Sequence, residues 1–149
     1  MKQFLSLLAL VVLFSCSDDT PTLSEDEQLQ DYITANGLNA EKTSSGLYVV
    51  IDNPGADPFP TSTSEVTVHY NGYFLNGQVF DSSIDRGFPL TISLTGVISG
   101  WQEGIPYFGT GGEGMLLMPS SLAYGSNGSG SIPPSTPLIF DVQVLSVNN

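Results

Sequence analysis

Few side chains in this sequence could act as a nucleophile, a general base or a metal ligand. It contains one cysteine, Cys16, and one histidine, His69, so neither an internal disulfide nor a cysteine–histidine zinc site can form. His69 alternates with Tyr70 in a strand-like stretch, which places the two side chains on opposite faces. We therefore expect His69 to be a hydrogen-bonded structural residue, and we expect any chemistry to need no metal or cofactor.

Aromatic residues and one pair of opposite charges are better candidates for a site. Arg86 is the only arginine, and it follows Asp81 by five residues in a stretch that we expect to be a loop. Residue type alone leaves two interpretations open, because the aromatic side chains could simply form core and the charged pair could be a surface ion pair of little energetic value. The aromatic candidates are Tyr70, Phe80, Trp101 and Phe140.

Length and charge limit the classes of function. At 149 residues the chain has room for one ordinary domain, and 16 glycines with 10 prolines favour a sheet with many turns over long helices. The net charge of −12 would repel nucleic acid and anionic lipid surfaces. Nucleic-acid binding is therefore excluded, and any membrane attachment must be covalent or hydrophobic.

The N-terminal segment has the features of a targeting signal. Lys2 precedes an almost uninterrupted apolar run at 4–14, FLSLLALVVLF. The run is shorter than the roughly 20 residues of a membrane-spanning helix and has the length of a signal-peptide core. Small Ser15 and then Cys16 follow the run directly. A buried structural cysteine is the alternative interpretation of Cys16.

The four residues LFSC, which end at Cys16, resemble a lipobox, the cleavage site of bacterial lipoproteins. The resemblance implies that residues 1–15 are a lipoprotein signal peptide and that Cys16 becomes lipidated. Residues 16–23 are polar and would form a flexible tether. We therefore expect a protein anchored by lipid to the outer membrane of the cell envelope, facing the periplasm or exposed on the surface.

A helix is predicted to follow the tether, within a segment of helix and linker at 24–45. Ser24 and Glu27 have the spacing of a capping box, and Gly37 can adopt the left-handed conformation that ends a helix. We therefore predict a helix at 25–36 that docks on the domain through one apolar face. That face consists of Leu29, Tyr32 and Ile33.

The remaining residues, 46–149, have the pattern of an α+β domain. Asn76-Gly77 between two apolar stretches predicts a hairpin, and the segment 97–108 predicts one short helix that Pro106 and Gly109 end. A sheet that packs on this helix is the arrangement that buries both. Strands are predicted at 47–51, 66–70, 90–94, 115–118 and 138–147.

One motif in this domain is misleading. The glycines at 109, 111 and 114 have the spacing of a dinucleotide-binding loop. That loop needs a strand before it and a helix after it, whereas here the order is reversed. We therefore expect an ordinary turn.

Four segments, read together, resemble the FKBP family of peptidyl-prolyl isomerases. The resemblance implies an antiparallel sheet of about five strands that wraps one short helix, with a ligand cleft between them, and the helix at 25–36 is an addition at the N-terminus. The segments keep the order and spacing of the family across 47–147. They are VHYNGYFLNGQVFDSSIDRGFPL at 68–90, VISGWQEGI at 97–105, PSSLAYG at 119–125 and IPPSTPLIFDVQVLSV at 132–147.

The resemblance also assigns positions in the cleft. Trp101 would form its floor, Tyr124 would place a hydroxyl at its rim, and the backbone N–H of Ile98 would contact a ligand carbonyl. Leu90 stands where many relatives have an aromatic wall. The implied catalytic positions are Tyr70, Phe80, Asp81, Trp101, Tyr124 and Phe140, and the implied substrate-binding positions are Arg86, Leu90, Val97, Ile98 and Ile132.

The implied activity is cis–trans isomerisation of X–Pro bonds in exported proteins, with a chaperone-like role and proline-containing polypeptides as partners. Two other functions fit the same sequence. One is a non-catalytic module that holds a proline-containing segment of an envelope partner, with the acidic helix as an extra contact surface. The other is a structural surface lipoprotein, which would have a filled cleft.

Overall fold

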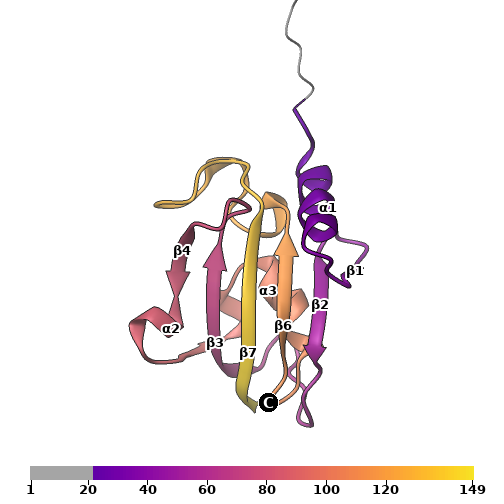
Figure 1. Ribbon diagram of the computed structural model, residues 1–149. Coiled ribbons are helices and arrows are strands. Elements are labelled where there is room, and N and C mark those ends of the chain that lie inside the picture. The colour runs from indigo at the N-terminus through magenta and orange to yellow at the C-terminus, as the bar shows by residue number, and fades with distance from the viewer. Residues whose placement is uncertain (1–21) are drawn as a thin grey trace, which may run out of the picture.

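One antiparallel sheet organises residues 22–149, which are the residues that the computed structural model describes (Figure 1). The signal peptide, Cys16 and most of the predicted tether lie outside them. The seven strands are ordered β1-β2-β6-β7-β3-β4, and β5 pairs with the first half of β3 beside β4. The strands are β1 (Glu41–Lys42), β2 (Tyr48–Asn53), β3 (Glu65–Tyr73), β4 (Val79–Ser82), β5 (Leu90–Ser93), β6 (Glu113–Met118) and β7 (Leu138–Asn148).

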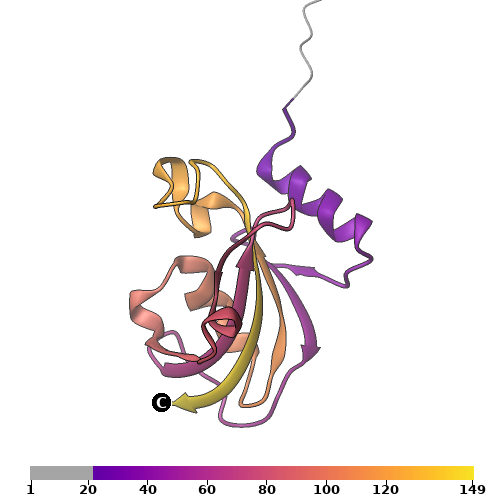
Figure 2. The same cartoon turned by 60° about the vertical axis from the view of Figure 1, so that its left-hand side comes forward.

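The main core lies between the sheet and helix α3 (Ser99–Gly104), which continues into the 3-10 turn η2 (Ile105–Tyr107). Alternation along each strand decides which side chains enter it, because successive residues point to opposite faces. On β7, for example, Phe140 and Val142 face α3, whereas Ile139 faces the other side. We call the α3 side the concave face, since the sheet curves around this helix (Figure 2).

Helix α1 (Glu25–Ala35) covers part of the opposite face, which we call the convex face (Figures 1 and 2). The predicted capping box is present, since the backbone N–H of Ser24 donates to Glu27 Oε2 over 2.8 Å and the N–H of Glu27 donates to Ser24 Oγ. Leu29 is fully buried, so the predicted docking is confirmed. The helix ends one residue earlier than predicted, with Asn36 as its cap and Gly37 at a φ of 61°.

The hairpin predicted at Asn76-Gly77 joins β3 and β4, where the N–H of Gly77 donates to the carbonyl of Phe74 over 2.8 Å. The glycines at 109 and 111 lie in a turn before β6, as expected. Among residues 22–149, no helix has the length and apolar character needed to cross a bilayer.

One sequence expectation needs correction. The stretch from Asp81 to Arg86 is not a loop, because Asp81 belongs to β4 and Arg86 ends the short helix α2 (Ser83–Arg86). The segment at 120–137 contains the 3-10 turns η3 (Ser120–Leu122) and η4 (Gly125–Asn127). Another 3-10 turn, η1 (Leu94–Gly96), follows β5.

Candidate active site

A cavity of about 260 Å³ opens on the concave face between α3 and the sheet. Its wall comes from strands, from α3 and from the segment after η3, so residues distant in sequence meet there. Most of the lining is apolar. The lining residues are Tyr70, Phe80, Asp81, Leu90, Ile92, Gly96, Val97, Ile98, Trp101, Tyr124 and Phe140.

Trp101 is 4% exposed, and other aromatic rings pack against its indole edge-to-face. The ring centroids of Trp101 and Tyr70 are 5.1 Å apart at an interplanar angle of 85°, and those of Trp101 and Phe140 are 5.4 Å apart at 83°. Phe80 packs on Phe140 in the same manner, 5.6 Å apart at 86°. The aromatic quadrupole favours this T-shaped geometry. The rings therefore hold one another as rigid walls around the cavity.

Gly72 in β3 makes this packing possible. A Cβ at this position would lie 2.8 Å from the rings of both Phe80 and Phe140, which is closer than side-chain atoms approach. Only glycine therefore lets the two aromatic walls meet over the strand. The resemblance did not single out Gly72, although an isolated glycine inside a strand is a signal of close approach.

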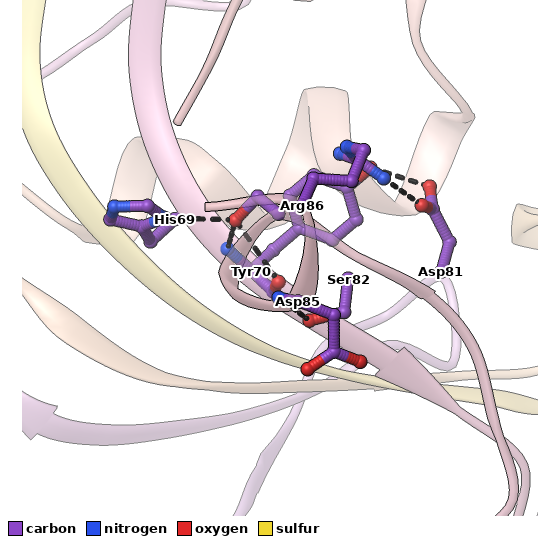
Figure 3. A network of polar contacts seen from close by, with 7 residues as sticks. His69, Tyr70, Asp81, Ser82, Asp85 and Arg86 are labelled. Atoms are coloured by element: carbon purple, nitrogen blue, oxygen red, sulfur yellow. Dashed lines mark hydrogen bonds and ion pairs between the residues drawn. The ribbon is translucent and has the colours of Figure 1, made fainter. Parts of the chain in front are cut away.

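A polar network stands beside the aromatic walls (Figure 3). The Tyr70 hydroxyl donates to Asp81 Oδ2 over 2.5 Å, and Arg86 Nη2 donates to the Tyr70 oxygen over 2.9 Å. Arg86 also pairs with Asp81, and its guanidinium lies 5.5 Å from the centre of the Tyr70 ring. Burial raises the pKa of Tyr70, and the hydrogen bond to Asp81 adds to this. The Tyr70 hydroxyl is thus neutral and already engaged.

Ser83 connects α2 to the strand that carries Tyr70. Its side chain is fully buried, and its Oγ accepts from the Tyr70 N–H over 2.8 Å and lies 3.0 Å from His69 Nδ1. His69 is thus a hydrogen-bonded residue of the sheet, as predicted. Ser82 caps α2 by accepting from the N–H of Asp85 over 3.1 Å. These contacts set the position of Arg86 above Tyr70.

Besides the buried Trp101 Nε1–H, two further hydrogen-bond donors at the cavity make no hydrogen bond within residues 22–149. One is the hydroxyl of Tyr124, whose residue is 37% exposed at the rim. Burial, followed by the nearby charge of Asp81, raises the pKa of Tyr124, so the hydroxyl keeps its proton. The other is the backbone N–H of Ile98, the residue that precedes the first turn of α3. Both donors are available to a ligand carbonyl.

The structure brings together all six implied catalytic positions, and Leu90, Val97 and Ile98 also line the cavity. Arg86 reaches the site only through Tyr70 and Asp81. Ile132 is the exception, because it does not line the cavity; it is 8% exposed and packs in the core. Sequence reasoning missed Ile92, although its alternation with Leu90 on β5 placed both on one face. No group of three metal-ligating side chains gathers anywhere in residues 22–149.

Comparisons with known proteins agree with this geometry. Residues 57–145 match the family model of the FKBP-type peptidyl-prolyl cis-trans isomerases. The FKBP-type isomerase FkpA of Buchnera aphidicola is 48% identical over 109 residues, which are 72% of this chain and 43% of that protein. This chain therefore spans about half the length of the curated relatives it matches.

Two solved structures are similar to the chain. The crystal structure of FkpA from Escherichia coli has a TM-score of 0.77 at 35% identity, and the match covers 84% of this chain and 59% of that one. A peptidyl-prolyl cis-trans isomerase from Pseudomonas syringae has a TM-score of 0.70 at 30% identity, with 86% of this chain and 98% of that one covered. Both matches cover most of this chain.

Proposed function

The chain belongs to the FKBP-type peptidyl-prolyl cis-trans isomerase family, and on this premise we propose that it catalyses rotation about X–Pro bonds in proteins of the bacterial cell envelope. The observation that carries the proposal is the open aromatic cavity of about 260 Å³ with Trp101 at its floor and two unengaged donors, the Tyr124 hydroxyl and the Ile98 N–H, at its edge. The aromatic lining suits a proline ring, and the two donors suit the carbonyl that precedes it.

The cavity lowers the barrier by favouring the twisted bond over the planar one. A peptide bond resists rotation by about 18–20 kcal/mol because nitrogen donates electrons to the carbonyl. Twisting removes that resonance, so the carbonyl becomes less polar and the nitrogen becomes pyramidal. A water-poor aromatic cavity therefore disfavours the planar amide relative to the twisted transition state. This reaction needs a rigid environment and no nucleophile.

Each group in the site has a distinct part in this scheme. The proline ring rests on the Trp101 indole between the walls formed by Phe80 and Phe140. The donors at Ile98 and Tyr124 hold the carbonyl while the chain beyond it rotates. Asp81 and Arg86 hold the Tyr70 hydroxyl in hydrogen bonds, which fixes the orientation of the Tyr70 ring in the cavity wall.

A proline tetrapeptide assay tests the proposal directly. The uncatalysed step takes roughly 10–100 s, so the purified protein should accelerate it clearly. The double variant Phe80→Ala/Trp101→Ala removes a wall and the floor, and it should return the rate toward the uncatalysed value. A wild-type rate no higher than that of the double variant would refute the activity. Tight peptide binding without acceleration would instead support the non-catalytic module.

The structure offers little support for the two other functions. The first-turn acids of α1 are engaged within the chain, since Glu25 bonds Ser120, Asp26 pairs with Lys42 and Glu27 caps the helix, so fewer of its charges remain for a partner. A structural lipoprotein would have a filled cleft, whereas this cavity is open. The isomerase function therefore fits best.

We also propose that lipidated Cys16 anchors the protein to the membrane, with residues 1–15 as signal peptide, 16–23 as tether, 24–45 as helix and linker, and 46–149 as isomerase domain. The support is the apolar run followed directly by a small residue and cysteine. Labelling of the producing bacterium with a fatty-acid analogue should mark the wild type and leave Cys16→Ala unmarked. Label on the Cys16→Ala variant would contradict the anchor.

A further inference from the structure

A carboxylate of α1 contacts the segment that carries Tyr124. Glu25 Oε2 accepts from the backbone N–H of Ser120 over 2.5 Å, and Oε1 accepts from the Ser120 hydroxyl over 2.7 Å. The two residues are 95 positions apart in sequence. Ser120 is 8% exposed and the contact is partly buried, so α1 is joined at two points to the segment that leads to Tyr124.

The 3-10 turn η3 depends on this carboxylate for its cap. The residue before the turn is Pro119, whose side chain offers no acceptor, and η3 has no side-chain cap from its own N-cap residue. The first N–H of the turn would otherwise be buried without a partner, which is unfavourable. Glu25, in a distant helix, therefore provides the hydrogen-bond acceptor that a Ser, Thr or Asp side chain at the cap position normally provides.

Backbone hydrogen bonds carry the contact on to Tyr124. The carbonyl of Ser120 accepts from the N–H of Ala123 over 2.9 Å, and Ala123 directly precedes Tyr124. On the other side, the carbonyl of Gly125 accepts from the N–H of Ser135 over 2.9 Å. Tyr124 thus lies between two segments fixed by backbone hydrogen bonds, one at Ser120 and one at Gly125, and Glu25 binds Ser120.

Glu25 is itself held in place by its neighbours in α1. Asp26 Oδ1 lies 2.6 Å from Lys42 Nζ and accepts from the Tyr48 hydroxyl over 2.8 Å, and Leu29 is fully buried one turn later. Glu25 therefore projects from a fixed helix, and its carboxylate can act as a reference point for η3.

We propose that Glu25 is a positioning residue for the isomerase reaction: it holds η3 so that the Tyr124 hydroxyl meets the substrate carbonyl. The inference rests on the proposed function and extends the active site to a helix on the convex face. Small displacements of a contacting group reduce rates substantially. We expect Glu25→Ala to lower kcat/KM about three- to tenfold, with little change in the amount of folded protein at the assay temperature.

Two alanine variants of the same helix serve as controls. Asp31→Ala removes an exposed acid that makes no hydrogen bond within residues 22–149, and Asp26→Ala releases the other anchor of α1 without touching Ser120. Asp31→Ala should retain kcat/KM within about twofold, and Asp26→Ala should lose clearly less than Glu25→Ala, because Leu29 still docks α1 and Glu25 still binds Ser120. Glu25→Gln keeps an acceptor for the Ser120 N–H and should recover most of the lost activity. An equal loss in Asp26→Ala and Glu25→Ala would overturn the proposal, because general undocking of α1 would then explain both.

A double-mutant cycle separates positioning from stability. If Glu25 acts through the Tyr124 hydroxyl, Glu25→Ala should reduce kcat/KM much less in a Tyr124→Phe background than in the wild type. Equal reductions in the two backgrounds would overturn the proposal.

Amide spectra of the full-length protein provide a readout that does not depend on activity. The Ala123 and Tyr124 signals should shift in Glu25→Ala and stay in place in Asp31→Ala, and unchanged signals in Glu25→Ala would overturn the positioning role. A wild type without isomerase activity would refute the proposed function, while this comparison would still decide whether Glu25 positions Tyr124.

Discussion

The two faces of the sheet are built from the same strands but differ in what they do. On the concave face, aromatic rings packed edge-to-face around Trp101 leave an open cavity. On the convex face, Leu29 of α1 closes over a cluster that includes Tyr48, Leu117 and Ile139, all nearly or fully buried. On the convex face α1 supplies Leu29 to fill the space, whereas the aromatic walls around Trp101 enclose a space that no side chain of residues 22–149 fills. The difference separates a stabilising face from a functional one.

Polar groups show the same contrast. On the convex face the Tyr48 hydroxyl donates to Asp26 over 2.8 Å and the Tyr73 hydroxyl donates to Asp141 over 2.9 Å. On the concave face the Tyr124 hydroxyl makes no hydrogen bond within residues 22–149. The Tyr124 hydroxyl can stay unengaged at little cost, because it lies at the rim where a ligand or solvent can reach it. Variants on each face should therefore affect different measurements.

The largest effect is expected from Leu29→Ala on the convex face. Removing a fully buried leucine side chain should lower the free energy of unfolding by about 3 kcal/mol, since it leaves a cavity under α1. Urea denaturation followed by circular dichroism measures this change. Leu23→Ala is the control, because Leu23 is 45% exposed and its loss should cost less than about 0.5 kcal/mol. Equal stability losses in the two variants would show that α1 is not docked.

Trp101→Leu should have the next largest effect, and it should appear in activity. Loss of the flat indole floor should lower kcat/KM on the order of 100-fold, which corresponds to about 2.7 kcal/mol of transition-state stabilisation. The tetrapeptide assay measures it, with Phe59→Leu as control because Phe59 is 39% exposed and lies outside the cavity lining. Near-normal kcat/KM in the Trp101→Leu variant would indicate that the aromatic cluster is only part of the hydrophobic core and has no catalytic role.

Tyr124→Phe should separate the effect on activity from the effect on stability most clearly. Losing the free hydroxyl should lower kcat/KM about tenfold, or about 1.4 kcal/mol, and leave stability unchanged within about 0.5 kcal/mol. Tyr107→Phe, at a similarly exposed tyrosine, should change neither quantity. Unaltered kinetics in Tyr124→Phe would remove this hydroxyl from the mechanism.

The reverse pattern is expected for Tyr48→Phe, which should lose about 1 kcal/mol of stability and retain activity.

The smallest effect is a pH-dependent one at Asp141. Burial raises the pKa of this carboxyl above its ordinary value, and Asp52 adds to the shift against the opposing Tyr73 hydrogen bond. A raised folded pKa means that folding favours the protonated form. The charged form therefore carries a penalty that is present above the folded pKa and is lost as pH falls toward the unfolded pKa of about 3.9.

Asp141→Asn should remove that penalty. The free energy of unfolding should rise by about 0.5 kcal/mol near pH 7, a modest gain because solvent screens a half-buried group, and the gain should shrink toward pH 4. Denaturation at several pH values measures it, with the exposed acid in Glu41→Gln as control. A gain that grows as pH falls would contradict the sign of the shift.

Most elements and most of the cavity lining could be predicted from the sequence, because their signals are local or are repeated across the family. The capping pair Ser24 and Glu27 is three residues apart, the Asn76-Gly77 turn is contiguous, and the alternation in β3 has a period of two. Such interactions form between neighbours whatever the rest of the chain does. The family pattern then placed residues such as Trp101 and Phe140 around one cleft.

The rest depended on segments that are distant in sequence and meet only in the folded chain. Ile132 is buried in the core, Gly72 is needed because two rings cross its strand, and Glu25 caps a turn 95 residues away. No spacing in the sequence encodes these approaches, since they follow from how the sheet curves and where α1 docks. Local patterns and the family resemblance therefore predicted most of the secondary structure and the family, whereas the packing of distant segments set which face stays open and which groups support it.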